Sequence, residues 1–168
     1  SFEEYSAEDI QKIIESSPTK SCSLDPVPTS ILKEFLPELL PFITMMCNRS
    51  LQEGILPPSQ KHAVITPIIK KVGSDPLNVR SYRPVSNLSY MSKLVERMVS
   101  RRLTHYLEGE KLLPKFQSGF RARHSTETAI LKVLSDILTA ADQGKVSILG
   151  LLDMSAAFDT VDHSILFD

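Results

Sequence analysis

The sequence has no tryptophan, only two cysteines and only four histidines in 168 residues. Cys22 and Cys47 lie far apart in the chain, and two cysteines cannot build the disulfide framework of a small secreted domain. The four histidines show none of the spacings that are typical of zinc ligands. We therefore expect neither disulfides nor a zinc site, and we expect an intracellular protein of the nucleus or the cytoplasm.

The sequence also lacks an uncharged apolar run of the roughly 18 residues that a membrane span needs. The stretch from Leu36 to Cys47 is the longest candidate, and two prolines and a glutamate interrupt it. The N-terminus is acidic at Glu3 and Glu4, where a signal peptide would be basic. We expect no contact with a membrane. Because no initiator methionine is present, we expect a piece of a longer protein.

The net charge of −1 conceals a segregated distribution of charged residues. Residues 80–132 carry 11 basic and 4 acidic side chains, a net charge of +7, whereas residues 133–168 carry 1 basic and 6 acidic side chains. A basic segment followed by an acidic one suggests a surface that meets phosphate beside a surface that meets metal. A helix with a solvated basic face would explain the same excess.

Apolar residues at helical spacing predict an α+β protein, in which short β-branched runs lie among helices. We expect N-caps at Ser6, at Thr29 and at Ser125 or Thr126. The expected helices are 6–16, 29–36, 37–54, 89–109 and 125–144. The expected strands are 63–69 and 79–85, which form a hairpin, and 146–152.

The run from Val146 to Leu152 is almost wholly apolar, which is typical of a central strand covered on both faces. It ends in Asp153, and a carboxylate held at the end of a buried strand can bind a hard cation. The alternative is that Asp153 caps a following helix, as aspartate commonly does.

Three sequence strings favour the cation-binding role of Asp153 over the helix-capping role. They are LLDMSAAFDTVDH (151–163), SYRPVSNLSYMSKLVERMVSRRL (81–103) and QSGFRARHSTETAI (117–130). The first resembles motif A of reverse transcriptases, and the other two resemble fingers segments of the LINE-type (non-LTR) retrotransposon enzymes, in the family's order. Residues 54–71 and 20–33 also resemble the family, although Gln60 and Leu24 stand where it usually has Trp and Gly.

The resemblance implies a partial right-hand polymerase fold. Residues 1–17 would be an N-terminal flank, 18–145 the fingers-like region, and 146–168 the first palm segment. It also implies RNA-directed DNA synthesis by two-metal nucleotidyl transfer with Mg²⁺ or Mn²⁺. The implied partners are an RNA template, a DNA primer, deoxynucleoside triphosphates and the rest of a polyprotein, with palm, thumb and a possible endonuclease domain.

The resemblance assigns roles to residues near the end of the chain. Asp153 would be a catalytic metal ligand, joined by the backbone carbonyl of Met154. The amides near Ala156 and Ala157 would cradle the triphosphate, and Phe158 would be the steric gate against a ribose hydroxyl. Core packing is the alternative role for Phe158.

Basic residues of the fingers complete the expected site. Lys70, Arg83 and Arg121 match positions that line the nucleotide path, with Phe120 packed inward so that Arg121 projects. Arg97, Arg101 and Arg102 would form a solvated helix face or a track for the nucleic-acid backbone.

One expected motif is missing from these 168 residues. The family's [YF]-A-D-D turn, which carries its second metal site, does not occur. We therefore expect the piece to be inactive alone. The competing hypothesis is a decayed or domesticated remnant that acts as a nucleic-acid-binding module. A metal-dependent nuclease lacks the further acidic and histidine positions that it would need.

Overall fold

The N-terminal half of the chain begins with three helices whose ends are set by local chemistry. In the computed structural model, which describes residues 3–153 and 161–167, α1 (Ala7–Glu15) starts where the Ser6 hydroxyl accepts a hydrogen bond from the amide of Asp9. The helix α3 (Leu36–Glu53) carries a proline in its first turn and ends at Gly54, whose φ of 65° suits glycine. These boundaries confirm the predicted ones.

The expected cap of the second helix is wrong. Pro28, not Thr29, is the N-cap residue of α2 (Thr29–Glu34), and no side chain caps this helix. The Thr29 hydroxyl instead donates to the carbonyl of Lys20 at 3.0 Å, while the Thr29 amide donates to the Ser21 hydroxyl at 2.8 Å. Thr29 is fully buried, and its hydrogen bonds hold the preceding loop against the start of α2.

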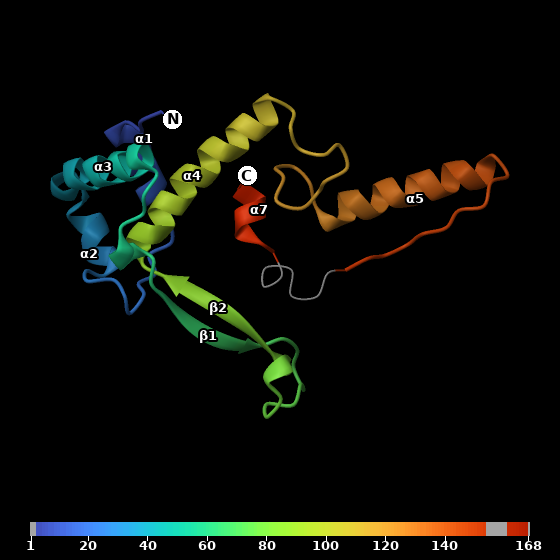
Figure 1. Ribbon diagram of the computed structural model, residues 1–168, viewed down its shortest axis with the longest axis horizontal. Helices are drawn as coiled ribbons and strands as arrows, with labels where there is room; N and C mark the ends of the chain where they lie inside the picture. The colour runs from blue at the N-terminus through green and yellow to red at the C-terminus, as the bar shows by residue number, and fades with distance from the viewer. Residues whose placement is uncertain (1–2, 154–160, 168) are drawn as a thin grey trace. The chain divides into compact units, whose positions relative to one another are not determined.

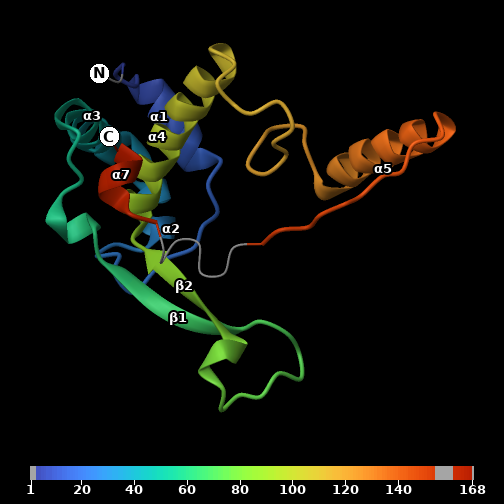
Figure 2. The same ribbon diagram turned by 45° about the vertical axis from the view of Figure 1, so that its right-hand side comes forward.

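A hydrophobic core joins α1, α3 and the long helix α4 (Tyr90–Gly109), which the Ser89 hydroxyl caps. Figures 1 and 2 show these three helices side by side. Ile10, Ile14, Cys47 and Met98 are completely buried within it. The N-terminal residues belong to this core, because the Tyr5 hydroxyl donates to the carbonyl of Met98 at 2.9 Å.

A two-stranded antiparallel hairpin extends from the helices (Figure 1). Strand β1 (Ala63–Ile69) pairs with β2 (Tyr82–Leu88), and Ile69 faces Tyr82 nearest the tip. The hairpin was predicted, but its second strand lies three residues later than expected. The cause is local: the Asn78 side chain accepts from the amide of Arg80, and residues 79–81 form a 3-10 turn.

The structure divides the chain into two units, Ser1–Leu113 and Pro114–Asp168. Residues 3–17 contribute to the core of the first unit. The second unit contains α5 (Thr126–Asp142) and the short α7 (His163–Phe167). A reciprocal capping box starts α5, because Ser125 and Thr128 each accept the other's amide hydrogen.

The expected buried strand at 146–152 is absent from the described part of the chain. Residues 145–153 follow α5 without secondary structure, and Val146, Ile148 and Leu152 are each more than 90% exposed. A strand requires a neighbour that accepts and donates its backbone hydrogen bonds. No described segment pairs with these residues, so their apolar sequence alone does not produce a strand.

The described residues therefore give an α+β arrangement. Among them, no helix combines the length and the apolar character that crossing a membrane requires.

Cysteine reactivity tests the packing of the first unit. Burial raises the pKa of the Cys47 thiol to about 12, whereas Cys22 is only half-buried. Since the thiolate is the nucleophile, iodoacetamide at about pH 8 should modify Cys22 long before Cys47. Mass spectrometry of the two cysteine peptides measures both rates.

Matched variants show whether this protection comes from the core. Met98→Ala should cost about 2–5 kcal/mol and accelerate labelling of Cys47. Val72→Ala, at a fully exposed position, should leave the rate unchanged. Labelling of Cys47 as fast as Cys22 in the unsubstituted chain would contradict the described core.

Candidate nucleic-acid interface

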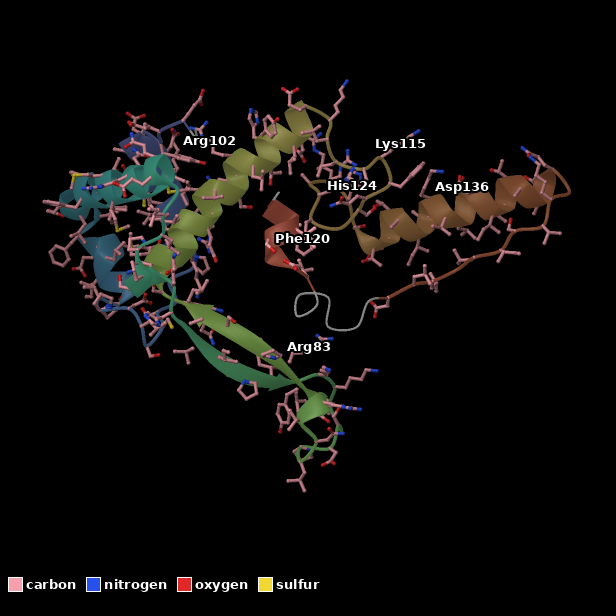
Figure 3. The ribbon with its side chains drawn as sticks, viewed as in Figure 1. Arg83, Arg102, Lys115, Phe120, His124 and Asp136 are labelled. Atoms are coloured by element: carbon pink, nitrogen blue, oxygen red, sulfur yellow. The ribbon has the colours of Figure 1, made fainter. Side chains whose placement is uncertain are left out.

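Two of the predicted phosphate-binding residues lie at the distal end of the hairpin, where Figure 3 labels Arg83. Arg83 is exposed on β2 opposite Ile68, and Lys70 follows the end of β1. The backbone amide of Lys70 donates to the carbonyl of Ser81 at 2.8 Å, which continues the ladder by one more pair. Because side chains alternate along a strand, Lys70 and Arg83 lie on the same face.

The loop between the strands presents both cations and aliphatic side chains. Lys71 and Arg80 add two charges to those of Lys70 and Arg83, and Val72 and Leu77 are more than 90% exposed. Internal hydrogen bonds hold the loop: the ammonium of Lys70 donates to the carbonyl of Arg80 at 2.9 Å, and the Tyr82 hydroxyl donates to that of Pro76. The tip is therefore an ordered basic surface.

The base of the hairpin is fixed to the start of α4 by Gln60. Its side-chain oxygen accepts a hydrogen bond from the Ser89 hydroxyl at 2.6 Å, and its backbone carbonyl accepts one from the Ser92 hydroxyl at 2.6 Å. The side chain of Gln60 is thus hydrogen-bonded to the N-cap residue of α4. Gln60 therefore fixes the segment just before β1 to the first turn of α4.

Asp25 makes the second connection to α4. One carboxylate oxygen accepts from the amide of Tyr90 and the other from the amide of Cys22, both at 2.6 Å. The Tyr90 hydroxyl also lies 2.7 Å from that of Ser17. The sequence did not predict the contact of Asp25 with Tyr90, because nothing local in the sequence indicates a partner 65 residues away.

The arginines of α4 do not act as one group. Arg102 is held by the N-terminal segment: its guanidinium lies 4.5 Å from the centre of the Tyr5 ring and pairs with Glu3 at 3.0 Å (Figure 3). Arg97 is half-buried and Arg101 is exposed. Of these three, Arg101 alone fits the expected solvated face.

The second unit reverses the expectation for Phe120 and Arg121. The Phe120 side chain is completely exposed, while the half-buried Arg121 donates to the carbonyl of Pro114 at 3.3 Å. Phe120 has a φ of 56°, a conformation in which an aromatic residue is uncommon and which redirects its side chain. The Gln117 side chain stabilises this turn by donating to the carbonyl of Gly119.

Asp153 is the last described residue before a gap, and it is exposed. The remaining residues expected at the site lie outside the described residues; they are Met154, Ala156, Ala157 and Phe158. Asp162 acts as a cap for α7, since one carboxylate oxygen accepts from the amide and the hydroxyl of Ser164. The hydroxyl contact lowers the pKa of Asp162.

In residues 3–153 and 161–167, no three histidine, cysteine or acidic side chains come close enough to hold a metal ion. Asp153 offers the hard oxygen donor that a divalent cation prefers. A two-ion site needs carboxylates from at least two places in a chain. Asp153 therefore fits one position of such a donor set, and the described residues do not complete it.

Comparison with known proteins gives a consistent set of relatives. Residues 69–168 match the family described as reverse transcriptase (RNA-dependent DNA polymerase). The chain is 32% identical to the RNA-directed DNA polymerase from mobile element jockey of Drosophila melanogaster, and 34% identical to the probable RNA-directed DNA polymerase from transposon BS of the same fly. It is 31% identical to the transposon TX1 uncharacterized 149 kDa protein of Xenopus laevis.

These alignments cover most of this chain and little of the relatives. They include 93%, 93% and 88% of the present chain, but 17%, 17% and 11% of the three relatives. The chain therefore spans about a sixth or less of the length of the curated relatives that it matches.

The connection between Asp25 and α4 can be tested by removing the carboxylate. Asp25→Ala leaves two partly buried amides without their acceptor, which should lower the free energy of unfolding by about 1–3 kcal/mol. Urea unfolding followed by far-UV circular dichroism measures this change.

Asp75→Ala is the matched control. Asp75 also accepts from a backbone amide, that of Leu77, but in the exposed tip, so its loss should cost no more than about 0.5 kcal/mol. Equal effects of the two variants would show that the Asp25 contact is not a structural connection.

Proposed function

Because the chain belongs to the reverse transcriptase (RNA-dependent DNA polymerase) family, in the branch of the LINE-type (non-LTR) retrotransposons, we propose that it is part of an enzyme that copies RNA into DNA. The observation that supports this most strongly is the family match over residues 69–168, which includes the basic end of the hairpin, Arg121 and Asp153. The relatives' printed names agree with it.

The proposed substrates are deoxynucleoside triphosphates, an RNA template and a DNA primer. In the proposed arrangement, residues 18–145 are fingers and 146–168 begin the palm, within a partial right-hand polymerase fold. The residues preceding 18 form the N-terminal flank. The rest of a longer protein would supply the remaining palm and the thumb.

Reverse transcriptases use divalent metal ions, and we infer Mg²⁺ or Mn²⁺ here. When bound, such ions lower the pKa of the primer hydroxyl and stabilise the departing pyrophosphate. Asp153 and the carbonyl of Met154 would supply ligands. The donor set must be completed by carboxylates outside this chain, because the [YF]-A-D-D string does not occur in it. The 168 residues alone would therefore not catalyse polymerisation.

The chain's other residues would bind and select the nucleotide. Lys70 and Arg83 share one face of the hairpin and are exposed, so both can reach phosphate. Arg121 would have to release the carbonyl of Pro114, a weak contact at 3.3 Å, to bind the triphosphate. Small residues at 156 and 157 let backbone amides approach phosphate oxygens. The ring of Phe158 would exclude a ribose hydroxyl.

A nucleic-acid-binding module without catalysis is the second candidate. It is favoured by one observation: exposed cations lie in both units, on the hairpin and in the segment before α5, independently of Asp153. The affinity of such a module for single-stranded nucleic acid would not change when Asp153 is substituted. The two candidates therefore differ in their response to substitution at this position.

Paired substitutions in the full-length protein test the proposed catalysis. Asp153→Asn retains shape but removes the charge that would hold the cation, so DNA synthesis with Mg²⁺ should fall about a thousandfold or more. Phe158→Val should retain synthesis and raise the incorporation of ribonucleotides relative to deoxynucleotides. Primer extension with each nucleotide pool measures both outcomes.

The control for charge is Asp142→Asn, at the exposed C-terminal end of α5, which should leave synthesis near normal. A folding defect would depress the variants at 153 and 158 alike and would be seen as reduced helical circular dichroism. Near-normal synthesis by Asp153→Asn would refute the assignment of Asp153.

A further inference from the structure

A cavity of about 510 Å³ lies between α3 and α4, but a second cavity, entirely within the other unit, has a more informative lining. This second cavity measures about 430 Å³, within the size range of small-ligand sites. It lies where the segment after Pro114 meets the first turns of α5, and Figure 3 labels Lys115, His124 and Asp136 around it. We call it the α5 cavity.

Positive charge dominates the lining of the α5 cavity. Lys115, Arg123 and Lys132 contribute three cations, against the single carboxylate of Asp136. Lys132 and Asp136 form an exposed pair one turn apart on α5, and such a pair contributes little to stability. An incoming phosphate can therefore compete for the Lys132 ammonium at small cost.

An aromatic ring lies among these charges. Phe116 lines the α5 cavity and is 71% exposed, so it is not part of a core. The ammonium groups of Lys115 and Lys132 lie 5.4 and 5.6 Å from the centre of its ring. An exposed ring with cations beside it is the combination that single-strand-binding proteins use, in which bases stack on the ring and phosphates pair with the cations.

His124 adds an oriented polar group. Its Nδ1 lies 2.8 Å from the carbonyl of Ala122, and because a carbonyl can only accept, Nδ1 carries the hydrogen of this contact. The other ring nitrogen remains available to the cavity. Polar groups at a site of this kind fix the orientation of the ligand.

From these contacts we propose that the α5 cavity binds one unpaired nucleotide of a single-stranded nucleic acid. The base stacks on Phe116, and the adjoining phosphates pair with Lys115, Arg123 and Lys132. A strand suits the lining better than a free triphosphate, since Asp136 would repel several negative charges concentrated at one point more than singly charged phosphodiesters. The identification of this strand as the template rests on the proposed function, whereas the binding itself does not.

The test uses the 168-residue chain and single-stranded oligonucleotides of about six nucleotides that carry a central 2-aminopurine. Fluorescence anisotropy gives the affinity, and quenching of 2-aminopurine at saturation reports stacking. All titrations contain EDTA, so that binding is measured without metal and without polymerisation. RNA and DNA versions are compared, and dTTP serves as the competitor that represents a free nucleotide.

Phe116→Leu keeps an apolar side chain and should weaken binding about tenfold while abolishing the quenching at saturation. Phe116→Trp should restore both. Phe120→Leu is the matched control, because Phe120 is a wholly exposed aromatic in the same segment that does not line the cavity. It should leave affinity and quenching unchanged.

Charge substitutions give effects of opposite sign. Lys132→Gln should weaken binding and reduce the slope of log affinity against log salt by about 0.7, the value for one phosphate contact with a single strand. Asp136→Asn should tighten binding, because it removes the repulsive charge and releases Lys132 from its partner. Lys145→Gln, beyond the far end of α5, is the matched control.

Equal affinities and equal quenching for the Phe116→Leu and Phe120→Leu variants would overturn the proposal, as would weaker binding by Asp136→Asn. Displacement of the strand by equimolar dTTP would also overturn it in favour of a free-nucleotide site. Failure of the proposed polymerase function is a separate result, seen as absent DNA synthesis by the full-length protein while these binding differences persist.

Discussion

The start of α4 is the point on which the arrangement of the first unit depends. Three segments converge there through hydrogen bonds to Ser89, Tyr90 and Ser92: the segment after α1, the loop with Asp25 and the turn with Gln60. The second strand of the hairpin leads directly into the helix. Ser17, Ser89, Tyr90 and Ser92 are buried, and Asp25 and Gln60 are half-buried. A buried polar group without a partner is costly. These hydrogen bonds thus fix the orientation of the hairpin relative to the helices of the first unit.

The hairpin itself contributes little to that core. Both of its faces are largely exposed, and apolar side chains such as Ile65 and Ile68 are more than half exposed. Its position is therefore set almost wholly at its base, where Gln60, Asn87 and Ser89 lie. The exposed cations at its far end therefore depend for their position on the hydrogen bonds at the base of the hairpin.

Local chemistry in the sequence predicted most of the elements. The serine cap at 6, the helix that begins after Ser89, the termination at Gly54 and the first strand were all predicted, because each depends on neighbouring residues. For α5 the sequence left Ser125 and Thr126 as alternative caps, and Ser125 is the cap. The family was also recognised from its motifs, and the match over residues 69–168 confirms it. Whether the roles assigned to Asp153 and Phe158 are correct stays a prediction.

Features that depend on distant or absent partners were not predictable in the same way. An apolar run such as Val146–Leu152 becomes a strand only when another strand accepts its hydrogen bonds, and periodicity contains no information about that partner. The direction of Phe120 and Arg121 depends on a positive φ that the sequence does not specify for a phenylalanine. The contact between Asp25 and Tyr90 spans 65 residues, so no local pattern could reveal it.

The pairing of Pro67 with Pro84 across the hairpin has a consequence for association between molecules. The pair Lys70–Ser81, three positions along the ladder, is hydrogen-bonded. Because hydrogen-bonded and non-hydrogen-bonded pairs alternate, the backbone groups of the proline pair point outward, away from the partner strand. Both outer edges of the hairpin therefore lack an amide donor at the same level. A third strand approaching either edge would meet a gap in its ladder there, and this two-stranded sheet is protected on both sides from edge-to-edge aggregation despite its exposed isoleucines.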